Sequence, residues 1–218
     1  MLAEKGFSIV SGPFEGDGLN SILDAHDRAI AAARLEETRI GSTSTRVDGL
    51  LDHAPELSAI FTHPPLLAAA AALIGGAFKL SAFHSRSLRP GAEAEPLHQD
   101  VAPGRDGWPL VGFIFMIDPF SVENGATRFL PASAGLASLP ETPTPARLCH
   151  ACGPAGAMIV FDGSVWHGHG ANMSGLWRRS VQGALIPKAA TAAMDHRRRL
   201  RPEAWAALPR EARMAIEP

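Results

Sequence analysis

The chain has 218 residues. This length suits one domain, because single β-rich domains commonly reach roughly 200–250 residues, and it allows a sizeable core to be buried. Hydrophobic residues make up 46% and charged residues 19% of the chain, a globular composition that excludes a disordered protein. The net charge of −2 and the pI near 6.5 give no electrostatic case for nucleic acid or an anionic membrane as a partner.

Two further features bear on the compartment. The first ten residues, MLAEKGFSIV, lack the basic region and long apolar core of a signal peptide. The longest apolar run, LLAAAAALIGGAF, is shorter than the roughly 20 residues that a membrane-spanning helix needs. We therefore expect a soluble, cytoplasmic protein. Cys149 and Cys152 form a CxxC motif without the second pair of a zinc ribbon, so we expect reduced thiols.

The first part of the chain, about residues 1–76, is predicted to be helical. Asp17 is a plausible N-cap for a helix whose buried face repeats at i, i+3 and i+4, formed by Leu19, Ile22, Leu23, His26 and Ile30. The segment 54–76 predicts a short helix followed by a longer one. Pro65 suits the first turn of the longer helix, and Gly75 or Gly76 suits its C-cap.

A β-rich core is predicted for about residues 77–187. The expected strands are FKLSAFHSRSL (78–88), LVGFIFMID (110–118), AMIVFDG (157–163) and RRSVQGALIP (178–187). Short strands separated by Gly- and Pro-containing turns indicate a sandwich or barrel, here of jelly-roll type. The tail, about 188–218, predicts a helix interrupted at Pro209, preceded by a short basic run, HRRRLR, that we expect to face solvent.

His98 and Asp100 form an HxD motif in the segment EAEPLHQD. Residues i and i+2 of a strand face the same side, so the imidazole and the carboxylate point to one place while Gln99 turns away. Two histidines and one carboxylate form a facial triad that suits non-haem Fe(II) and O₂ chemistry. HxD alone occurs often by chance, so the third ligand decides. His167 and His169, in VWHGHG, share a strand face, and parity does not choose between them.

Three segments resemble the phytanoyl-CoA dioxygenase family of Fe(II)/2-oxoglutarate-dependent oxygenases. They are PLHQD (96–100), FMIDPFSVENGATRFLPAS (115–133) and GAMIVFDGSVWHGHGANMSGLWRRS (156–180). They stand in the family's order and lie between roughly residues 80 and 186, about half of the chain. The resemblance implies a mainly β fold with flanking helices, a double-stranded β-helix (jelly roll, cupin-like) that holds iron between its two sheets.

The resemblance also separates the two histidines. In the family, an arginine for the cosubstrate follows the distal histidine by eleven residues. From His167 this position is Arg178, whereas from His169 it is Ser180, which is no cation. His167 is therefore implied as the third ligand, and His169 as a pocket residue. Arg178 and Ser180 share a strand face that would bind the C5 carboxylate of 2-oxoglutarate, with Arg179 facing solvent.

The resemblance thus implies a hydroxylase that uses Fe(II), 2-oxoglutarate and O₂ on a small organic molecule, with release of succinate and CO₂. The implied metal ligands and catalytic residues are His98, Asp100 and His167, and the implied cosubstrate residues are Arg178, Ser180 and Thr127. Thr127 would donate a hydrogen bond near the metal-bound end of the cosubstrate, or be a plain strand threonine. Halogenating relatives carry Gly or Ala in place of the carboxylate ligand, so Asp100 favours hydroxylation.

Some positions are less informative. Glu95 stands where the family often has Gln, and residues 131–134 read PASA where the family has PGSH, which makes the substrate less inferable from relatives. Arg86 is a candidate for a substrate anion. Trp166 and Trp177 face away from the ligand and the arginine by parity, so packing is the expected role. The oligomeric state and the primary substrate stay open.

Two alternatives remain at this stage. A cupin-like metalloenzyme that does not use 2-oxoglutarate would need the triad but not Arg178 or Ser180. A non-catalytic ligand-binding relative would tolerate the loss of Asp100 or His167, and the presence of both residues counts against it.

Overall fold

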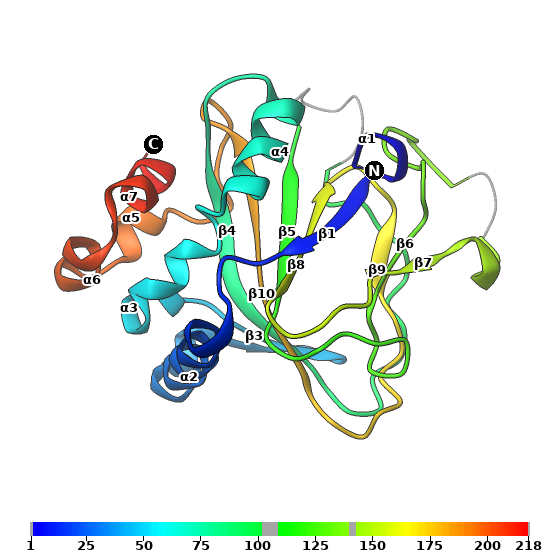
Figure 1. Cartoon of the computed structure of the whole chain (residues 1–218), viewed down its shortest axis with the longest axis horizontal. Helices are drawn as coiled ribbons and strands as arrows, with labels where there is room; N and C mark the ends of the chain where they lie inside the picture. The colour runs from blue at the N-terminus through cyan, green and yellow to red at the C-terminus, as the bar shows by residue number, and fades with distance from the viewer. Residues whose placement is uncertain (1, 102–108, 140–142, 218) are drawn as a thin grey trace.

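A computed structural model describes residues 2–101, 109–139 and 143–217. Its centre is an antiparallel seven-stranded sheet, which faces a smaller three-stranded sheet (Figure 1). In sheet order the seven strands are β1 (Phe7–Ser11), β8 (Ala157–Asp162), β5 (Val111–Met116), β10 (Arg178–Pro187), β4 (Phe78–Leu88), β3 (Ser44–Val47) and β2 (Thr38–Ile40). The smaller sheet consists of β7 (Cys149–His150), β6 (Thr127–Phe129) and β9 (His167–His169). This is the predicted jelly-roll arrangement of two facing sheets.

Most helices cover the face of the large sheet that points away from the small one (Figure 1). The helices of the described residues are α1 (Leu2–Lys5), α2 (Gly16–Ala32), α3 (Leu50–His53), α4 (Pro64–Ile74), α5 (His196–Arg199), α6 (Pro202–Ala207) and α7 (Arg210–Ile216), with short 3-10 turns η1 (Leu35–Glu37), η2 (Pro55–Ala59) and η3 (Pro145–Arg147). α1 lies apart from the helical layer, beside β1 and β8 (Figure 1). No helix in the described part of the chain has an apolar stretch long enough to cross a bilayer.

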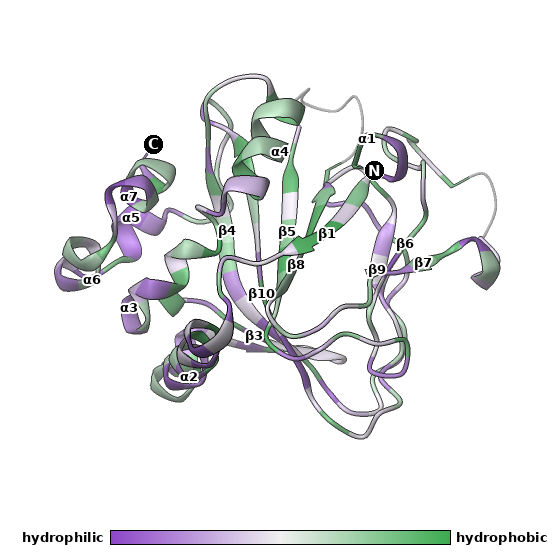
Figure 2. Cartoon of the chain, in the orientation of Figure 1, coloured by the Kyte–Doolittle hydropathy of each residue, from purple (hydrophilic) through white to green (hydrophobic). Residues whose placement is uncertain are grey.

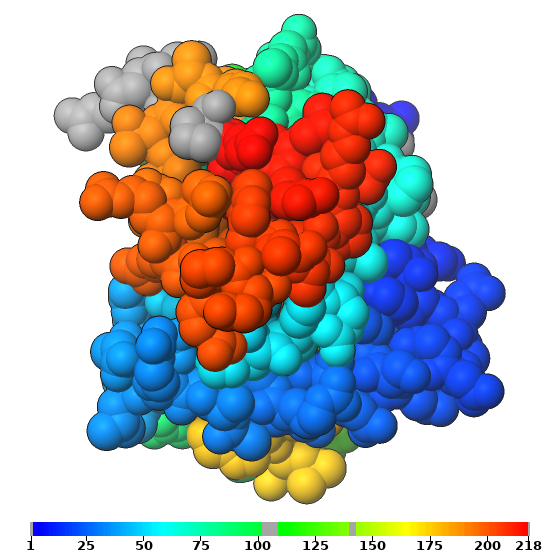
Figure 3. All heavy atoms as spheres, turned by 90° about the vertical axis from the view of Figure 1, so that its left-hand side faces the viewer, coloured from blue at the N-terminus to red at the C-terminus, as the bar shows by residue number. Residues whose placement is uncertain are grey.

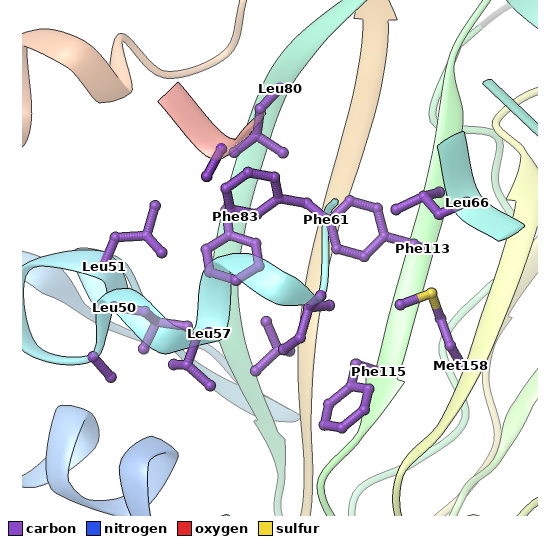
Figure 4. Packing of buried hydrophobic residues seen from close by; sticks show 14 of the residues in the cluster. Leu50, Leu51, Leu57, Phe61, Leu66, Leu80, Phe83, Phe113, Phe115 and Met158 are labelled. Carbon is purple, nitrogen blue, oxygen red and sulfur yellow. The ribbon is translucent and has the colours of Figure 1, made fainter. Parts of the chain in front are cut away.

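Two apolar cores hold these layers together. Figure 2 shows that β5 and β8 are strongly hydrophobic, as expected for strands that are buried on both faces. Phe113 and Phe115 of β5 join the core under the helices, where Phe61 packs edge-on against Phe83 with ring centroids 5.2 Å apart (Figure 4). Ile114, between them, points into the second core, between the two sheets. The alternation along one strand therefore serves both layers.

The helical prediction for the first part of the chain missed its strands. β1 pairs with β8, and β2 and β3 extend the large sheet beyond β4. These segments have three to five residues, too few for a two-residue period to stand out against the neighbouring helical pattern. The Asp17 N-cap was also wrong, because Glu15 holds that position and Asp17 lies in the first turn of α2. The longer predicted helix agrees with α4, including Gly75 in the left-handed C-cap conformation.

The C-terminal tail forms α6 and α7, separated at Pro209 as predicted. Figure 3 shows this segment lying against the earlier helical layer. The basic run before it is only partly a solvated face. His196 is buried, and the Arg197 guanidinium lies 4.3 Å from the ring centroid of Trp205. Cys149 and Cys152 carry free thiols, the first half-buried and the second exposed.

Candidate active site

Three side chains converge between the two sheets. The ligand atoms of His98, Asp100 and His167 all lie within 4.8 Å of one another. Asp100 stands between the histidines, with one carboxylate oxygen 3.9 Å from Nε2 of His98 and the other 3.8 Å from Nε2 of His167. His98 and Asp100 belong to an irregular segment and not to a regular strand, so the expected strand geometry was only approximate. Two imidazole nitrogens and one carboxylate form the donor set of a facial-triad metal site.

Hydrogen bonds fix which nitrogen each histidine presents. Nδ1 of His167 lies 3.0 Å from the carbonyl oxygen of Val165, and Nδ1 of His98 lies 3.2 Å from that of Pro96. A carbonyl oxygen only accepts, so each Nδ1 carries the proton and each Nε2 keeps its lone pair free. Burial lowers the pKa of His167, although the carboxylate of Asp100 opposes the shift. The imidazole is therefore neutral, which is the form that binds a metal ion.

Apolar rings hold His167 in place. Its ring centroid lies 4.7 Å from that of Phe161 and 5.5 Å from that of Phe129. Phe161 occupies the space beside Gly112, where a side chain would overlap its ring. Gln99 turns away from the triad, as predicted, and its Nε2 donates to the carbonyl oxygens of Leu136 and Ser164.

Arg178 lies at the inner end of the same chamber, a cavity of about 320 Å³ that is also lined by the triad. Its side chain is 1% exposed, and its Nη1 donates to the carbonyl oxygen of Gly125. The guanidinium lies 4.1 Å above the ring of Phe120. Burial lowers the pKa of Arg178 to about 9, and the charge of Arg86 adds to the effect.

No carboxylate of the described residues lies within ion-pair distance of Arg178, and its Nε has no hydrogen-bond partner there. A buried cation without a counter-charge is costly. The chamber therefore has a strong preference for an anionic group at this end.

Ser180 and Thr127 flank this end. The Ser180 hydroxyl donates to the carbonyl oxygen of Arg86 at 3.1 Å and accepts from Nε2 of Gln182 at 3.2 Å. It would have to rotate to donate to a carboxylate. Thr127 is buried on β6 and lines the chamber wall. Its backbone pairs with that of His169 across the small sheet.

Arg179 points to the other face of β10. Its guanidinium binds Asp27 at 2.5 Å and Asp118 at 2.8 Å. Hydrogen bonds that Arg179 donates to Asp118 raise the pKa of Arg179 despite partial burial. The expected solvent-facing arginine is thus two-thirds buried and ion-paired, but it takes no part in the chamber.

His169 lies in the chamber, away from the triad. Its Nδ1 donates to the carbonyl oxygen of Gly170, and its Nε2 lies 3.8 Å from Glu95. Glu95 also binds Arg86 at 3.0 Å. Burial alone would raise the pKa of Glu95, but the charge of Arg86 holds it below its ordinary value. Glu95 and Arg86 are therefore an ion pair on the chamber wall.

Several chamber residues were not assigned from the sequence, among them Arg46, His84 and Gln182. The strand period of β4 and β10 places His84 on the same face as Arg86, and Gln182 on the same face as Arg178, which was a usable signal. Trp166 and Trp177 lie outside the chamber, as predicted. The indole Nε1 of Trp166 donates to the carbonyl oxygen of Leu136, and Trp177 is half-exposed.

The fold and this donor set together place the chain among jelly-roll proteins with a candidate facial-triad metal site between two sheets. Comparison with known proteins narrows the class. Residues 2–180 match the family model described as phytanoyl-CoA dioxygenase (PhyH). The chain is 33% identical to the dioxygenase trt7 of Aspergillus terreus over 204 residues, which cover 86% of this chain and 71% of that protein. The chain belongs to the phytanoyl-CoA dioxygenase family.

Other relatives match over shorter regions. The dioxygenase af480 of Aspergillus fumigatus is 33% identical over 133 residues, which cover 56% of this chain and 43% of that protein. The matched region of this chain therefore spans less than half of the length of that curated relative.

Solved structures share the fold at low sequence identity. HygX from Streptomyces hygroscopicus, crystallised with nickel, 2-oxoglutarate and hygromycin B, superposes with a TM-score of 0.71 at 15% identity, covering 88% of this chain and 86% of that one. SnoK, an alpha-ketoglutarate-dependent carbocyclase from nogalamycin biosynthesis, gives a TM-score of 0.72 at 17% identity, with 92% and 88% covered.

Proposed function

We propose that this protein is an Fe(II)- and 2-oxoglutarate-dependent dioxygenase that hydroxylates a small organic molecule and releases succinate and CO₂. One observation carries the proposal: the His98, Asp100 and His167 donors share a chamber with Arg178, a buried guanidinium that lacks a carboxylate partner among the described residues. A triad alone suits many metal-dependent reactions. A triad with an anion receptor in the same cavity suits a metal-chelating dicarboxylate.

His98, Asp100 and His167 would hold the ferrous ion. Each imidazole presents its Nε2, and a carboxylate lies between them, which fits a hard-to-borderline divalent ion. Three protein ligands would leave positions for the cosubstrate and for O₂. When bound, Fe(II) with 2-oxoglutarate and O₂ supplies an oxidant able to attack a C–H bond.

Arg178 would bind the distal carboxylate of 2-oxoglutarate. Its exposed fraction of 1% makes a charge-assisted pair there strong, because little water competes. Ser180 would add a hydroxyl donor after rotation, and Thr127 a donor from the opposite sheet. Phe120, stacked on the guanidinium, keeps its fork in one orientation. The protein would thus position the cosubstrate and keep water out of the inner end.

The names of similar proteins support this proposal. Relatives that share about a third of their matched residues are named dioxygenases. HygX, which shares the fold, was crystallised with 2-oxoglutarate and with nickel.

A turnover assay tests the proposal. The purified chain is incubated with Fe(II), ascorbate, O₂, 2-oxoglutarate and a panel of candidate substrates, and succinate is measured. Succinate should form only when both Fe(II) and 2-oxoglutarate are present, and Asp100→Ala should abolish it while the exposed Asp24→Ala should not. Iron binding without any 2-oxoglutarate turnover would favour the cupin-like alternative. Iron affinity unchanged in Asp100→Ala would favour a binding protein without catalysis.

A further inference from the structure

The side chains that the large sheet turns towards the chamber form successive cross-strand rows, and the rows differ in charge, polarity and size. Cross-strand pairing places Ser180 beside Arg86, then Gln182 between His84 and Ile114, and then Ala184 between Ala82 and Gly112. From the inner end outward, the wall is therefore cationic, then polar, then lined with small residues. Ala82 and Ala184 line the cavity with small side chains, whereas the Phe161 ring fills the space beside Gly112. The polar row therefore lies between the cationic row and the small-residue row.

The polar row lies beside the expected cosubstrate position. Gln182 stands on β10, the strand that also carries Arg178. His84 lies on β4 beside Gln182, and Arg46 lies on β3, where it pairs with Arg86 and so stands in the adjoining cationic row. The row faces the same cavity as the triad. These three side chains are therefore available to a second molecule.

His84 has hydrogen-bonding capacity that the protein does not use. Its Nδ1 is shielded from solvent and has no partner among the described residues. Burial lowers the pKa of His84 to about 3, and Arg46 adds to this effect, so the ring is neutral and offers one donor and one acceptor. A buried polar atom without a partner is costly. A substrate oxygen placed against it would remove that penalty.

The charges around the chamber are already balanced. Arg46 binds Asp48 at 2.9 Å, and Arg86 binds Glu95 at 3.0 Å. Under the proposed function, Arg178 pairs with the distal carboxylate of 2-oxoglutarate. The two charges of Fe(II) are matched by Asp100 and by the metal-bound carboxylate. No lining charge of the described residues is left to neutralise a substrate anion or cation.

We propose that His84, Gln182 and Arg46 form the substrate-recognition wall, and that the substrate is a compact, uncharged molecule with hydroxyl or carbonyl oxygens near the reacting carbon. The inference rests on the proposed function for the placement of the cosubstrate. The chamber of about 320 Å³ must hold both molecules, which favours a small inserted portion. Acyl-CoA thioesters carry several anionic phosphates that nothing on this wall would neutralise, and a bare alkyl chain would leave His84 without a partner.

Binding is measured first, with Zn(II) in place of iron and with 2-oxoglutarate present, so that no turnover is needed. The probes are small neutral hydroxylated cyclic ketones, the same skeletons with a carboxylate in place of one hydroxyl, and fatty acyl-CoA thioesters. Calorimetry should show the neutral probes binding about tenfold more tightly than their carboxylate analogues. Tighter binding of the carboxylates or of the CoA esters would overturn the inference.

Variants then locate the recognition. His84→Phe and Gln182→Leu keep volume but lose hydrogen bonds, and each should weaken binding of the neutral probes about tenfold. His84→Asn keeps a donor and an acceptor and should restore part of the affinity. His63→Phe, the same change outside the chamber, should leave the preference as it was. Equal affinities in His84→Phe, Gln182→Leu and the unmodified protein would also overturn the inference.

The two proposals fail in distinguishable ways. Neutral probes that bind through His84, with no Fe(II)-dependent succinate formed from any of them, would count against the proposed function and leave the recognition wall standing. Succinate formation that carboxylates or CoA esters stimulate most would do the reverse.

Discussion

His98 and His167 face each other as an isolated antiparallel bridge, each amide donating to the other residue's carbonyl oxygen at 2.8 and 2.9 Å. Their rings lie 4.6 Å apart between centroids. The pairing of two backbone segments, 69 positions apart in the chain, therefore sets the spacing of the two imidazoles. The side chains need little freedom to be held at ligand distance, which is the kind of preorganisation that a metal site requires.

This bridge predicts unequal roles for the two histidines of β9. His167→Ala should reduce the affinity for Fe(II) or Ni(II) by at least about tenfold, because it removes a metal ligand. Loss of a residue that only hydrogen-bonds to a ligand already lowers metal affinity about tenfold. His169→Ala should have a mild effect on metal binding, since its nitrogens contact Gly170, Thr43 and Glu95. Metal titration followed by calorimetry measures both variants. A larger loss in His169→Ala would reverse the assignment.

The adjacent arginines of β10 provide a matched pair. Arg178→Gln should raise the KM for 2-oxoglutarate about 10- to 150-fold, the equivalent of the ~1.5–3 kcal/mol of a charge-assisted hydrogen bond. Arg178→Lys keeps the positive charge but loses the two-pronged guanidinium, so its KM for 2-oxoglutarate should lie between those of the unmodified protein and Arg178→Gln. Iron affinity should persist in both variants, because Arg178 contacts no member of the triad.

Arg179→Gln is the control for this pair. It removes the ion pairs with Asp118 and Asp27, which are partly exposed. We expect a loss of ~1 kcal/mol in the free energy of unfolding, or about 2–4 °C in Tm, with the KM for 2-oxoglutarate unchanged. A KM that rises equally in Arg178→Gln and Arg179→Gln would show that neither effect comes from contact with the cosubstrate.

Gly112 supports the metal site through Phe161. A methyl group at this position would overlap the Phe161 ring, which packs on His167. Gly112→Ala should therefore destabilise the fold by ~1–3 kcal/mol and weaken metal binding together. Thermal unfolding and Ni(II) titration follow the two effects. Gly18→Ala, in open space on α2, should leave both readouts intact or raise Tm slightly.

Stability should fall in mild acid because of buried histidines. Burial, with the charge of Arg199, lowers the pKa of His196 to about 4 from its ordinary value of 6.5. Between these values the unfolded chain binds a proton that the folded chain does not, so the free energy of unfolding falls as the pH drops from about 6.5 towards about 4. The lowered pKa of His84 acts in the same direction.

His196→Gln should flatten this dependence without abolishing it, because His84 remains. Urea titrations at several pH values between 4 and 7 measure the slope. A slope that is identical in His196→Gln and the unmodified protein would contradict the assignment to His196.

The sequence by itself determined the class of fold and the family, and it predicted the donor set of the candidate site. A β core was predicted from the apolar run that forms β5 and from the turn residues around it. The family was identified from the HxD motif together with the downstream segment that contains His167 and Arg178. These signals are local, since strand period, turn residues and motif spacing are written in consecutive positions. The same locality explains the mistakes. β1, β2 and β3 are too short to show a period, and they are strands because neighbouring edges offer them hydrogen-bond partners.

Only the tertiary structure decided which residues share the chamber. His84, Gln182 and Arg46 come from three strands that meet through register, and no motif joins them. Strand parity predicted that Arg178 and Arg179 face opposite sides of the sheet. It did not predict that Arg178 lacks a carboxylate partner among the described residues, or that Arg179 has two. Burial and charge balance depend on contacts between residues far apart in the chain. A sequence specifies such contacts only through the complete fold.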